Sequence, residues 1–336
     1  TLGRLGNQRR GAVSEEKRAN DVLNSICFAP LGVIRVHGVD NQGMQSAEFA
    51  PVGLHSPATG YSRKYSDHTD AGPVRFYSFT YAEKIMDHVH LLDRLIGSEL
   101  PPLRSAAEQQ AFEAMPYEDR IIPQSTYEAL QLGAAHNPGA PAFQFLKNAD
   151  PDETPLTVSY AQFMARVTQS ANFFNDLGIG PNDVVSFLMP LVPQAFFALF
   201  GAQAAGIANP VNPLLSAGQI TEILRAANTR VLVALGPVPG SDIWNKVQRV
   251  KDDLPNLKAI VVVHGTTDEA SAVYGFDAVI DKYPADRLTS GRRIAATDTA
   301  GYFHTGGTTG TPKLVRHTHR NQVYQAWAMS LMLPSA

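Results

Sequence analysis

The sequence predicts an α/β protein built on a mostly parallel β-sheet with helices on both faces. Two observations lead to this prediction. From about residue 111 to residue 300, short apolar runs of strand length alternate with stretches whose apolar residues recur at helical spacing. The predicted strands are apolar apart from Ser186, Arg230 and Lys258, which is typical of strands that are buried on both faces of a parallel sheet.

Local signals mark the ends of the individual elements. Strands are expected at residues 184–189, 230–235 and 258–263. Two capping boxes predict helix starts, Ser159 with Gln162 and Ser216 with Gln219. The remaining helix signals are a stop at Gly178, a start at Pro193 followed by a stop at Gly206, and a helical run over residues 243–254.

One long stretch without charged residues has to be considered as a possible membrane span. No charged side chain occurs between Asp183 and Glu222. Prolines interrupt the stretch at positions 190, 193, 210 and 213, and the uninterrupted apolar pieces are shorter than the ~20 residues that a membrane span needs. We therefore expect this stretch to form buried α/β core.

Composition narrows the class of protein. A chain of 336 residues with 44% apolar and 18% charged residues is typical of a globular protein with a large core and two or more domains. The net charge of −3 argues against a nucleic-acid-binding surface. The single cysteine, Cys27, excludes an internal disulfide and agrees with a reducing compartment. With no secretory leader recognisable, we expect a cytoplasmic protein.

Residues 1–110 form an N-terminal extension or accessory segment to which the sequence assigns no function. A helix is expected over residues 83–96. His88 and His90 invite a metal-site interpretation, but residues two apart on a helix do not share a face, so a solvated surface is favoured. We expect no metal site.

The most distinctive stretch follows the apolar pair Tyr302 and Phe303, and we expect it to leave the sheet at an edge. Glycines allow the backbone to approach a ligand closely, and successive amides of such a turn form a concavity that binds anions. The candidate phosphate ligands are its amides, hydroxyls and one ammonium group, contributed by Thr305, Gly306, Gly307, Thr308, Thr309, Gly310 and Lys313. The alternative is a glycine- and threonine-rich surface turn.

This loop is not a Walker P-loop. The Walker motif requires Gly-Lys-Ser/Thr in direct succession, with the lysine opening a helix. Here Thr311 and Pro312 separate Gly310 from Lys313, and no serine or threonine follows the lysine. The sequence predicts a phosphate loop of another kind.

The run from Thr305 to Lys313, followed by His317, His319 and Asn321, resembles the core loop of the adenylate-forming (AMP-binding) superfamily. Residues 125–130, 137–141 and 158–160 are similar to the opening segments of acyl-CoA synthetases. Residues 178–183 and 205–215 are similar to the two core segments before the loop. Over residues 115–336, the chain is identified as the front part of the large N-terminal domain of the acyl-CoA synthetase or fatty-acid–CoA ligase branch.

The resemblance implies a two-step reaction with ATP, Mg²⁺ and coenzyme A. A carboxylic acid, expected to be a fatty acid, attacks the α-phosphorus of Mg-ATP, and a thiol then accepts the acyl group from the acyl-AMP. The loop residues would hold the β- and γ-phosphates. Arg316 and Arg320 would add positive potential or lie on a solvated helix face. At most one of His317 and His319 would face the loop. A long-chain acid would bring the protein to a membrane surface as a peripheral protein.

The chain departs from the family pattern in two positions and in its extent. Gly306 stands where serine is common, and Leu314 stands where glycine is common. The later elements of the family, including the catalytic lysine, are expected beyond Ala336. Residues 111–336 are therefore expected to form an incomplete adenylation domain that is inactive alone, with no identifiable catalytic residue. Two alternatives stay open: a module that loads a carrier protein, and a non-catalytic nucleotide-binding or interaction module.

Overall fold

The computed structural model describes residues 33–36, 47–50, 105–114, 121, 123–147, 152–305 and 313–332. Its main feature is a seven-stranded sheet with the strand order β11-β10-β6-β5-β7-β8-β9. Neighbouring strands run parallel except for β10 and β11, which are antiparallel. The strands are β5 (Val184–Leu188), β6 (Ile207–Pro210), β7 (Thr229–Leu235), β8 (Ala259–Val263), β9 (Val273–Gly275), β10 (Thr299–His304) and β11 (Leu314–Thr318).

The three strands that the sequence predicts are neighbours in this sheet. They are β5, β7 and β8, and each differs from its predicted bounds by a single residue at one end. Every residue of β5 and β8 is buried, as the continuous apolar runs indicate. The predicted fold class is confirmed.

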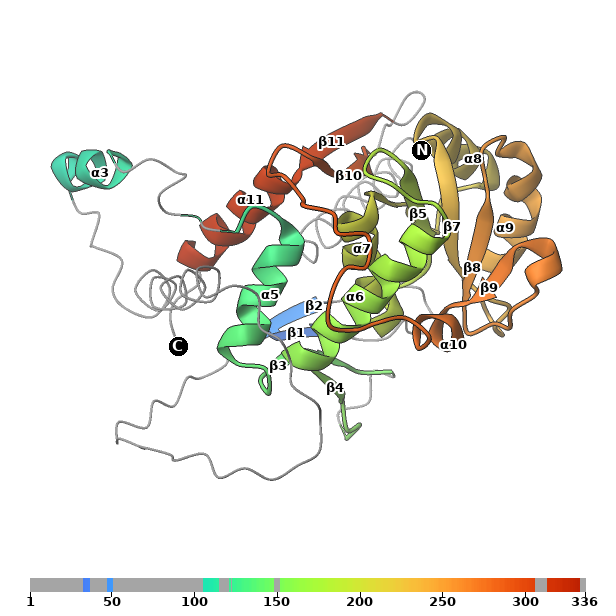
Figure 1. The fold of residues 1–336 in the computed structure, drawn as a ribbon, viewed down its shortest axis with the longest axis horizontal. Coiled ribbons are helices and arrows are strands. Elements are labelled where there is room, and N and C mark those ends of the chain that lie inside the picture. The colour runs from blue at the N-terminus through green and yellow to red at the C-terminus, as the bar shows by residue number, and fades with distance from the viewer. Residues whose placement is uncertain are drawn as a thin grey trace, which may run out of the picture.

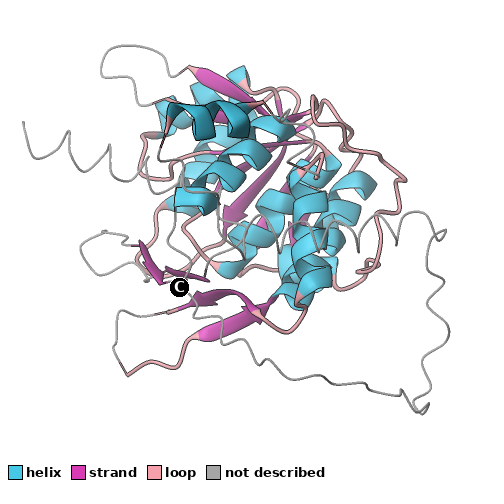
Figure 2. Cartoon of the chain, turned by 90° about the vertical axis from the view of Figure 1, so that its left-hand side faces the viewer, coloured by secondary structure: helices cyan, strands magenta, loops and turns pink. Residues whose placement is uncertain are grey.

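Helices cover both faces of the sheet (Figures 1 and 2). Helices α6 (Tyr160–Asp176) and α7 (Pro193–Ala205) pack against each other, whereas α8 (Ala217–Ala226) and α9 (Ile243–Val250) pack together against β7. Both predicted capping boxes are present, at Ser159 and Ser216. Gly178 follows α6 with a φ of 78°, a left-handed conformation that favours glycine.

The long stretch without charge forms β5, α7 and β6, and most of it is buried. Helix α7 approaches α6 so closely that a Cβ atom at Gly201 would lie 2.5 Å from the Cβ atom of Ser170. Among the helices in the described ranges, none has both the length and the apolar character needed to cross a membrane.

A second sheet lies beneath the helices in Figure 2, and the sequence does not predict it. Its order is β2-β1-β3-β4, with β1 (Val33–Val36), β2 (Ala47–Ala50), β3 (Pro141–Phe145) and β4 (Leu156–Ser159). Phe143 of β3 attaches it to the main body, because its ring lies 5.6 Å from that of Phe163 on α6 and 5.0 Å from that of Phe196 on α7. The predicted helix at residues 83–96, with His88 and His90, lies outside the described residues.

Two further helices, α5 (Thr126–His136) and α10 (Phe276–Ile280), pack onto the body. Helix α5 packs against α6, α7 and α11 (His319–Met332), and α10 packs against α6 and β8. Helix α3 (Ala106–Glu113) begins with a capping box at Ser105. The chain after α10 then has to return from β9, at one edge of the sheet, to β10 near the other edge.

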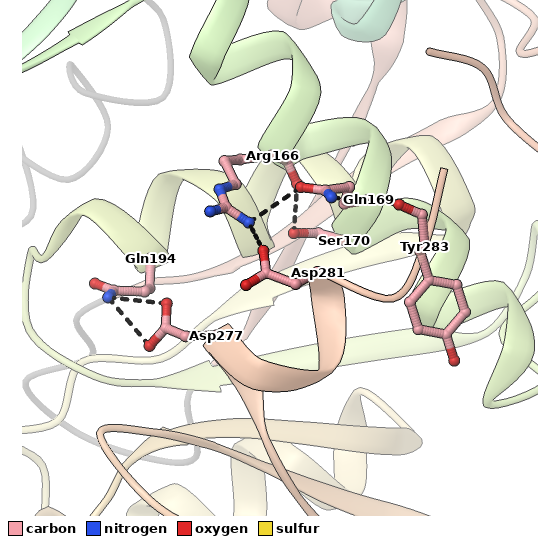
Figure 3. A network of polar contacts seen from close by, with 7 residues as sticks. All are labelled: Arg166, Gln169, Ser170, Gln194, Asp277, Asp281 and Tyr283. Atoms are coloured by element: carbon pink, nitrogen blue, oxygen red, sulfur yellow. Dashed lines mark hydrogen bonds and ion pairs between the residues drawn. The ribbon is translucent and has the colours of Figure 1, made fainter. Parts of the chain in front are cut away.

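Polar contacts fasten α10 to α7, and the returning segment to α6 (Figure 3). Arg166 of α6 forms an ion pair with Asp281, and Gln169 donates to the carbonyl of Tyr283 at 3.3 Å. Gln194 of α7 donates to both oxygens of Asp277, at 3.2 and 3.4 Å. The chain is thus held on α6 before it reaches β10.

Asn172 of α6 is the most deeply buried residue that makes such contacts. Its side chain is 1% exposed, and its amide nitrogen donates to the carbonyls of Pro284 and Arg287, both at 2.9 Å. Its amide oxygen accepts from the backbone N–H and the hydroxyl of Thr289, at 2.8 and 3.1 Å. One side chain therefore satisfies four polar groups of the returning segment.

We expect Asn172→Ala to lower the free energy of unfolding by about 2–4 kcal/mol, because four hydrogen bonds are lost and each contributes a net of about 0.5–1.5 kcal/mol. Urea denaturation followed by circular dichroism would measure the loss. The matched control is Gln169→Ala, which loses a single hydrogen bond to the returning segment, so its cost should be about 1 kcal/mol. Equal losses in the two variants would contradict the role of Asn172.

Candidate functional site

The predicted phosphate loop connects two antiparallel strands. The backbone N–H of Thr305 donates to the carbonyl of Lys313 at 2.9 Å, directly after the register pair His304–Leu314. Both Thr305 and Lys313 are exposed, and together they form the mouth of the loop. The other candidate ligands, Gly306, Gly307, Thr308, Thr309 and Gly310, lie outside the described residues.

The mouth lies at the edge of the main sheet, as the sequence predicts, because β11 is an edge strand. Strand β10 runs parallel to β6, so the loop leaves the sheet at its carboxyl edge. Ligands of open α/β sheets bind outside the carboxyl ends of the strands. The chain continues from the loop into a strand and not into a helix, which agrees with the exclusion of a Walker P-loop.

A tight turn after β6 lies beside the mouth. The N–H of Asn212 donates to Nε2 of His304 at 3.1 Å, and the N–H of Leu214 donates to Oδ1 of Asn212 at 2.9 Å. Nζ of Lys246, on α9, donates to the carbonyl of Pro213 at 2.7 Å. Burial lowers the pKa of His304, so its imidazole is neutral near pH 7.

The sequence gives no role to His304 or to its contact with Asn212. Two signals could have suggested the contact. His304 directly precedes the first phosphate-loop residue, and Asn212 lies in the core segment at residues 205–215. Nothing in the local pattern brings the two residues together, however, because 92 positions separate them.

Leu314, which stands where the family commonly has glycine, has a structural role. Its half-buried side chain packs with Tyr302 against an apolar cluster formed by Val184, Ile207 and Ala227. This side chain therefore anchors the start of β11 to the body of the sheet.

The basic residues after the loop are divided between two elements. Arg316 is exposed on β11 and does not lie on a helix, whereas Arg320 is exposed in the first turn of α11. His317 is in register with Gly301 and packs on Phe303, with ring centroids 4.8 Å apart. By this register, His317 lies farther from the mouth than Leu314.

His319 is fully buried in a polar network that joins α5, α7 and α11. Its Nδ1 accepts from the N–H of Thr126 at 3.3 Å. The hydroxyl of Thr126 donates to Oε1 of Gln203 at 2.7 Å, and Nε2 of Gln203 donates to Oε1 of Gln322 at 2.9 Å. His319 therefore fixes the position of α11 and does not face the loop.

Burial and the nearby guanidinium of Arg292 lower the pKa of His319 to about 4, although Asp298 partly opposes them. The unfolded chain takes up this proton near its ordinary pKa of 6.5, and the folded chain takes it up only near 4. The free energy of unfolding should therefore fall as the pH drops from 6.5 to 4. The contribution of His319 is about 3 kcal/mol, by linkage between pKa and stability.

We expect His319→Gln to remove this part of the pH dependence, because glutamine keeps a hydrogen-bond acceptor but takes up no proton. Urea denaturation at pH 7, 5.5 and 4.5 would compare the variant with the wild type. The control is Thr126→Ser, which keeps His319 together with the N–H and the hydroxyl that contact it, and which should keep the wild-type pH dependence. A His319→Gln profile parallel to the wild type would show that His319 does not titrate as stated.

Comparisons with known proteins agree with the resemblance noted in the sequence. The profile of the family described as AMP-binding enzyme matches residues 130–335. A marinolic acid–CoA ligase of Pseudoalteromonas sp. (strain SANK 73390) is 33% identical over 233 residues, which cover 69% of this chain and 35% of the relative. A long-chain-fatty-acid–CoA ligase of Drosophila melanogaster is 25% identical, covering 66% of this chain and 34% of the relative.

Among solved structures, acetoacetyl-CoA synthetase from Streptomyces lividans shares the fold. Its TM-score is 0.51 at 20% sequence identity, and the match covers 59% of this chain and 32% of that one. The chain thus spans about a third of the length of these curated relatives. In the described parts of the chain, no three His, Cys, Asp or Glu side chains gather as a metal site would require.

Proposed function

The chain belongs to the AMP-binding enzyme family, and we propose that it supplies the phosphate-binding part of an AMP-forming acid–thiol ligase. In the proposed reaction, a carboxylate oxygen attacks the α-phosphorus of Mg-ATP, and pyrophosphate leaves as the acyl-AMP forms. The sulfur of coenzyme A then attacks the acyl carbonyl and displaces AMP. Both relatives are named CoA ligases, which supports coenzyme A as the acceptor. The name of the Drosophila relative supports a fatty acid as the acid.

The mouth of the loop is the observation that carries this proposal. The hydrogen bond from Thr305 to Lys313 joins the two residues that flank the seven-residue segment 306–312. This segment contains the three glycines and two of the threonines that were named as candidate phosphate ligands. Lys313 places an exposed positive charge where the loop returns to the sheet. Adenylation needs charge stabilisation on a polyphosphate more than it needs proton transfer, and amides, hydroxyls and an ammonium group provide this stabilisation.

The proposal assigns to this chain only one part of the complete site. Residues 111–336 would form the front part of the adenylation domain, ending after the phosphate loop. The groups that hold the ribose, the adenine and the α-phosphate would come from residues beyond Ala336. The roughly one-third coverage of the curated relatives supports this division.

We expect Lys313→Ala, in a protein carrying this chain and the rest of the adenylation domain, to lower the efficiency of adenylation roughly tenfold to a hundredfold. A charge-assisted contact contributes ~1.5–3 kcal/mol, and ~1.4 kcal/mol corresponds to a factor of ten. Acid-dependent release of pyrophosphate at subsaturating ATP would measure the change. The control is Lys258→Ala, an exposed lysine that precedes β8 at the amino edge of the sheet. An unchanged rate in Lys313→Ala would refute the phosphate assignment.

We also expect residues 1–336 alone to bind ATP weakly and to catalyse no adenylation. Rate depends on holding the carboxylate in line with the α-phosphorus, and one wall of the site cannot do so. The purified chain would be incubated with Mg-ATP and a panel of fatty and aromatic acids, followed by assays for pyrophosphate and for acyl hydroxamate. Acid-dependent turnover near ~1–10³ s⁻¹, the ordinary enzyme range, would show that the site is complete in this chain.

A further inference from the structure

The backbone donors of β6 alternate between its two neighbours in the sheet. Ile207 N–H donates to the carbonyl of Asp183, and Val211 N–H donates to the carbonyl of Phe187, each at 2.9 Å and on the side of β5. Successive residues of a strand direct their N–H groups to opposite edges. Residues 208, 210 and 212 therefore face β10, where Ala208 is in register with Gly301.

Proline interrupts this edge just before the site. Pro210 has no N–H group and cannot continue the ladder toward β10. The next donor on the same edge is the N–H of Asn212, and it donates to Nε2 of His304 at 3.1 Å. An imidazole nitrogen therefore accepts the hydrogen bond that a backbone carbonyl of β10 would accept in a regular ladder.

We propose that His304 is a positioning residue for the phosphate loop, because its ring joins the last residue of β10 to the turn after β6. This inference rests on the proposed function. The turn that receives His304 is itself held, by Lys246 at the Pro213 carbonyl and by Asn212 at the Leu214 N–H.

The loop begins one residue after His304, and its ends are joined by the hydrogen bond from Thr305 to Lys313. The register pairs between β10 and β11 orient this hairpin internally. The pair Ala208–Gly301 lies farther back along the sheet. The hydrogen bond of the His304 imidazole is the contact nearest the loop among those described between β10 and the β6 segment. It therefore fixes the position of the mouth relative to the sheet.

The geometry also fixes the form of the ring. Since Nε2 accepts from Asn212, the proton of the neutral imidazole has to lie on Nδ1. Burial favours the neutral ring, in agreement with this tautomer. A glutamine side chain can place its Oε1 oxygen where Nε2 lies, whereas a leucine side chain fills a similar space without an acceptor.

The test measures binding of inorganic tripolyphosphate to residues 1–336 by calorimetry at pH 8. We expect His304→Leu to weaken binding roughly fivefold to tenfold, the equivalent of one net hydrogen bond, and His304→Gln to restore most of it. The control is His317→Leu, the other histidine of the hairpin, which should bind like the wild type. Hydrogen exchange should show that the Asn212 amide loses protection in His304→Leu and keeps it in His304→Gln.

The outcomes separate this inference from the proposed function. Equal binding by the wild type and His304→Leu, or no recovery in His304→Gln, overturns the positioning role and leaves the phosphate assignment standing. A wild type that binds no tripolyphosphate refutes the phosphate assignment, and the positioning role with it. If His304→Leu does not fold, the ¹⁵N spectrum of the wild-type histidines, which reports the tautomer of His304, tests the inference instead. The Nδ1–H tautomer at His304 together with normal binding by His304→Gln supports the inference, and the Nε2–H tautomer overturns it.

Discussion

The candidate site depends on how the parallel sheet satisfies its backbone donors where the strands end. A buried strand needs a partner for every N–H group that faces a neighbour. At the end of β6, proline removes one such donor and the turn after the strand supplies another. The hairpin of β10 and β11 is placed against this edge, and with it Thr305 and Lys313 at the mouth between the two strands. The position of the mouth thus depends on a backbone requirement of the strand beside it.

Much of the fold could be predicted because its signals are local. The capping boxes at Ser159 and Ser216 and the apolar runs of β5, β7 and β8 lie within a few residues of the elements that they specify. The second sheet has no such signal. Strand β3 begins with a proline and is only partly buried, unlike β5 and β8, and its Phe143 is buried against helices that come later in the chain. Its role becomes visible only when these helices are placed.

The sequence names the residues of the candidate site, and their role stays a prediction, but it does not indicate the contacts that hold them in place. Thr305 and Lys313 were expected from the sequence, and the structure places them across the mouth of a hairpin. The contact of His304 with Asn212 and that of His319 with Thr126 join residues that are far apart in the chain. A related difficulty concerns Arg316, which lies on the exposed edge strand β11. The short sequence of this strand has no hydrophobic periodicity that would distinguish a strand from a helix.

The strand order has a consequence for the folding of the chain during synthesis. Strands β5 to β9 are complete by Gly275, whereas β10 begins only at Thr299, after the segment fastened to α6. Domains begin to fold as they leave the ribosome. The edge of β6 that later pairs with β10 therefore stays unpaired while the intervening residues are synthesised. An open strand edge invites pairing with other chains, and a proline there discourages it. Pro210 would thus protect the nascent sheet from aggregation at the edge that the phosphate-loop hairpin later covers.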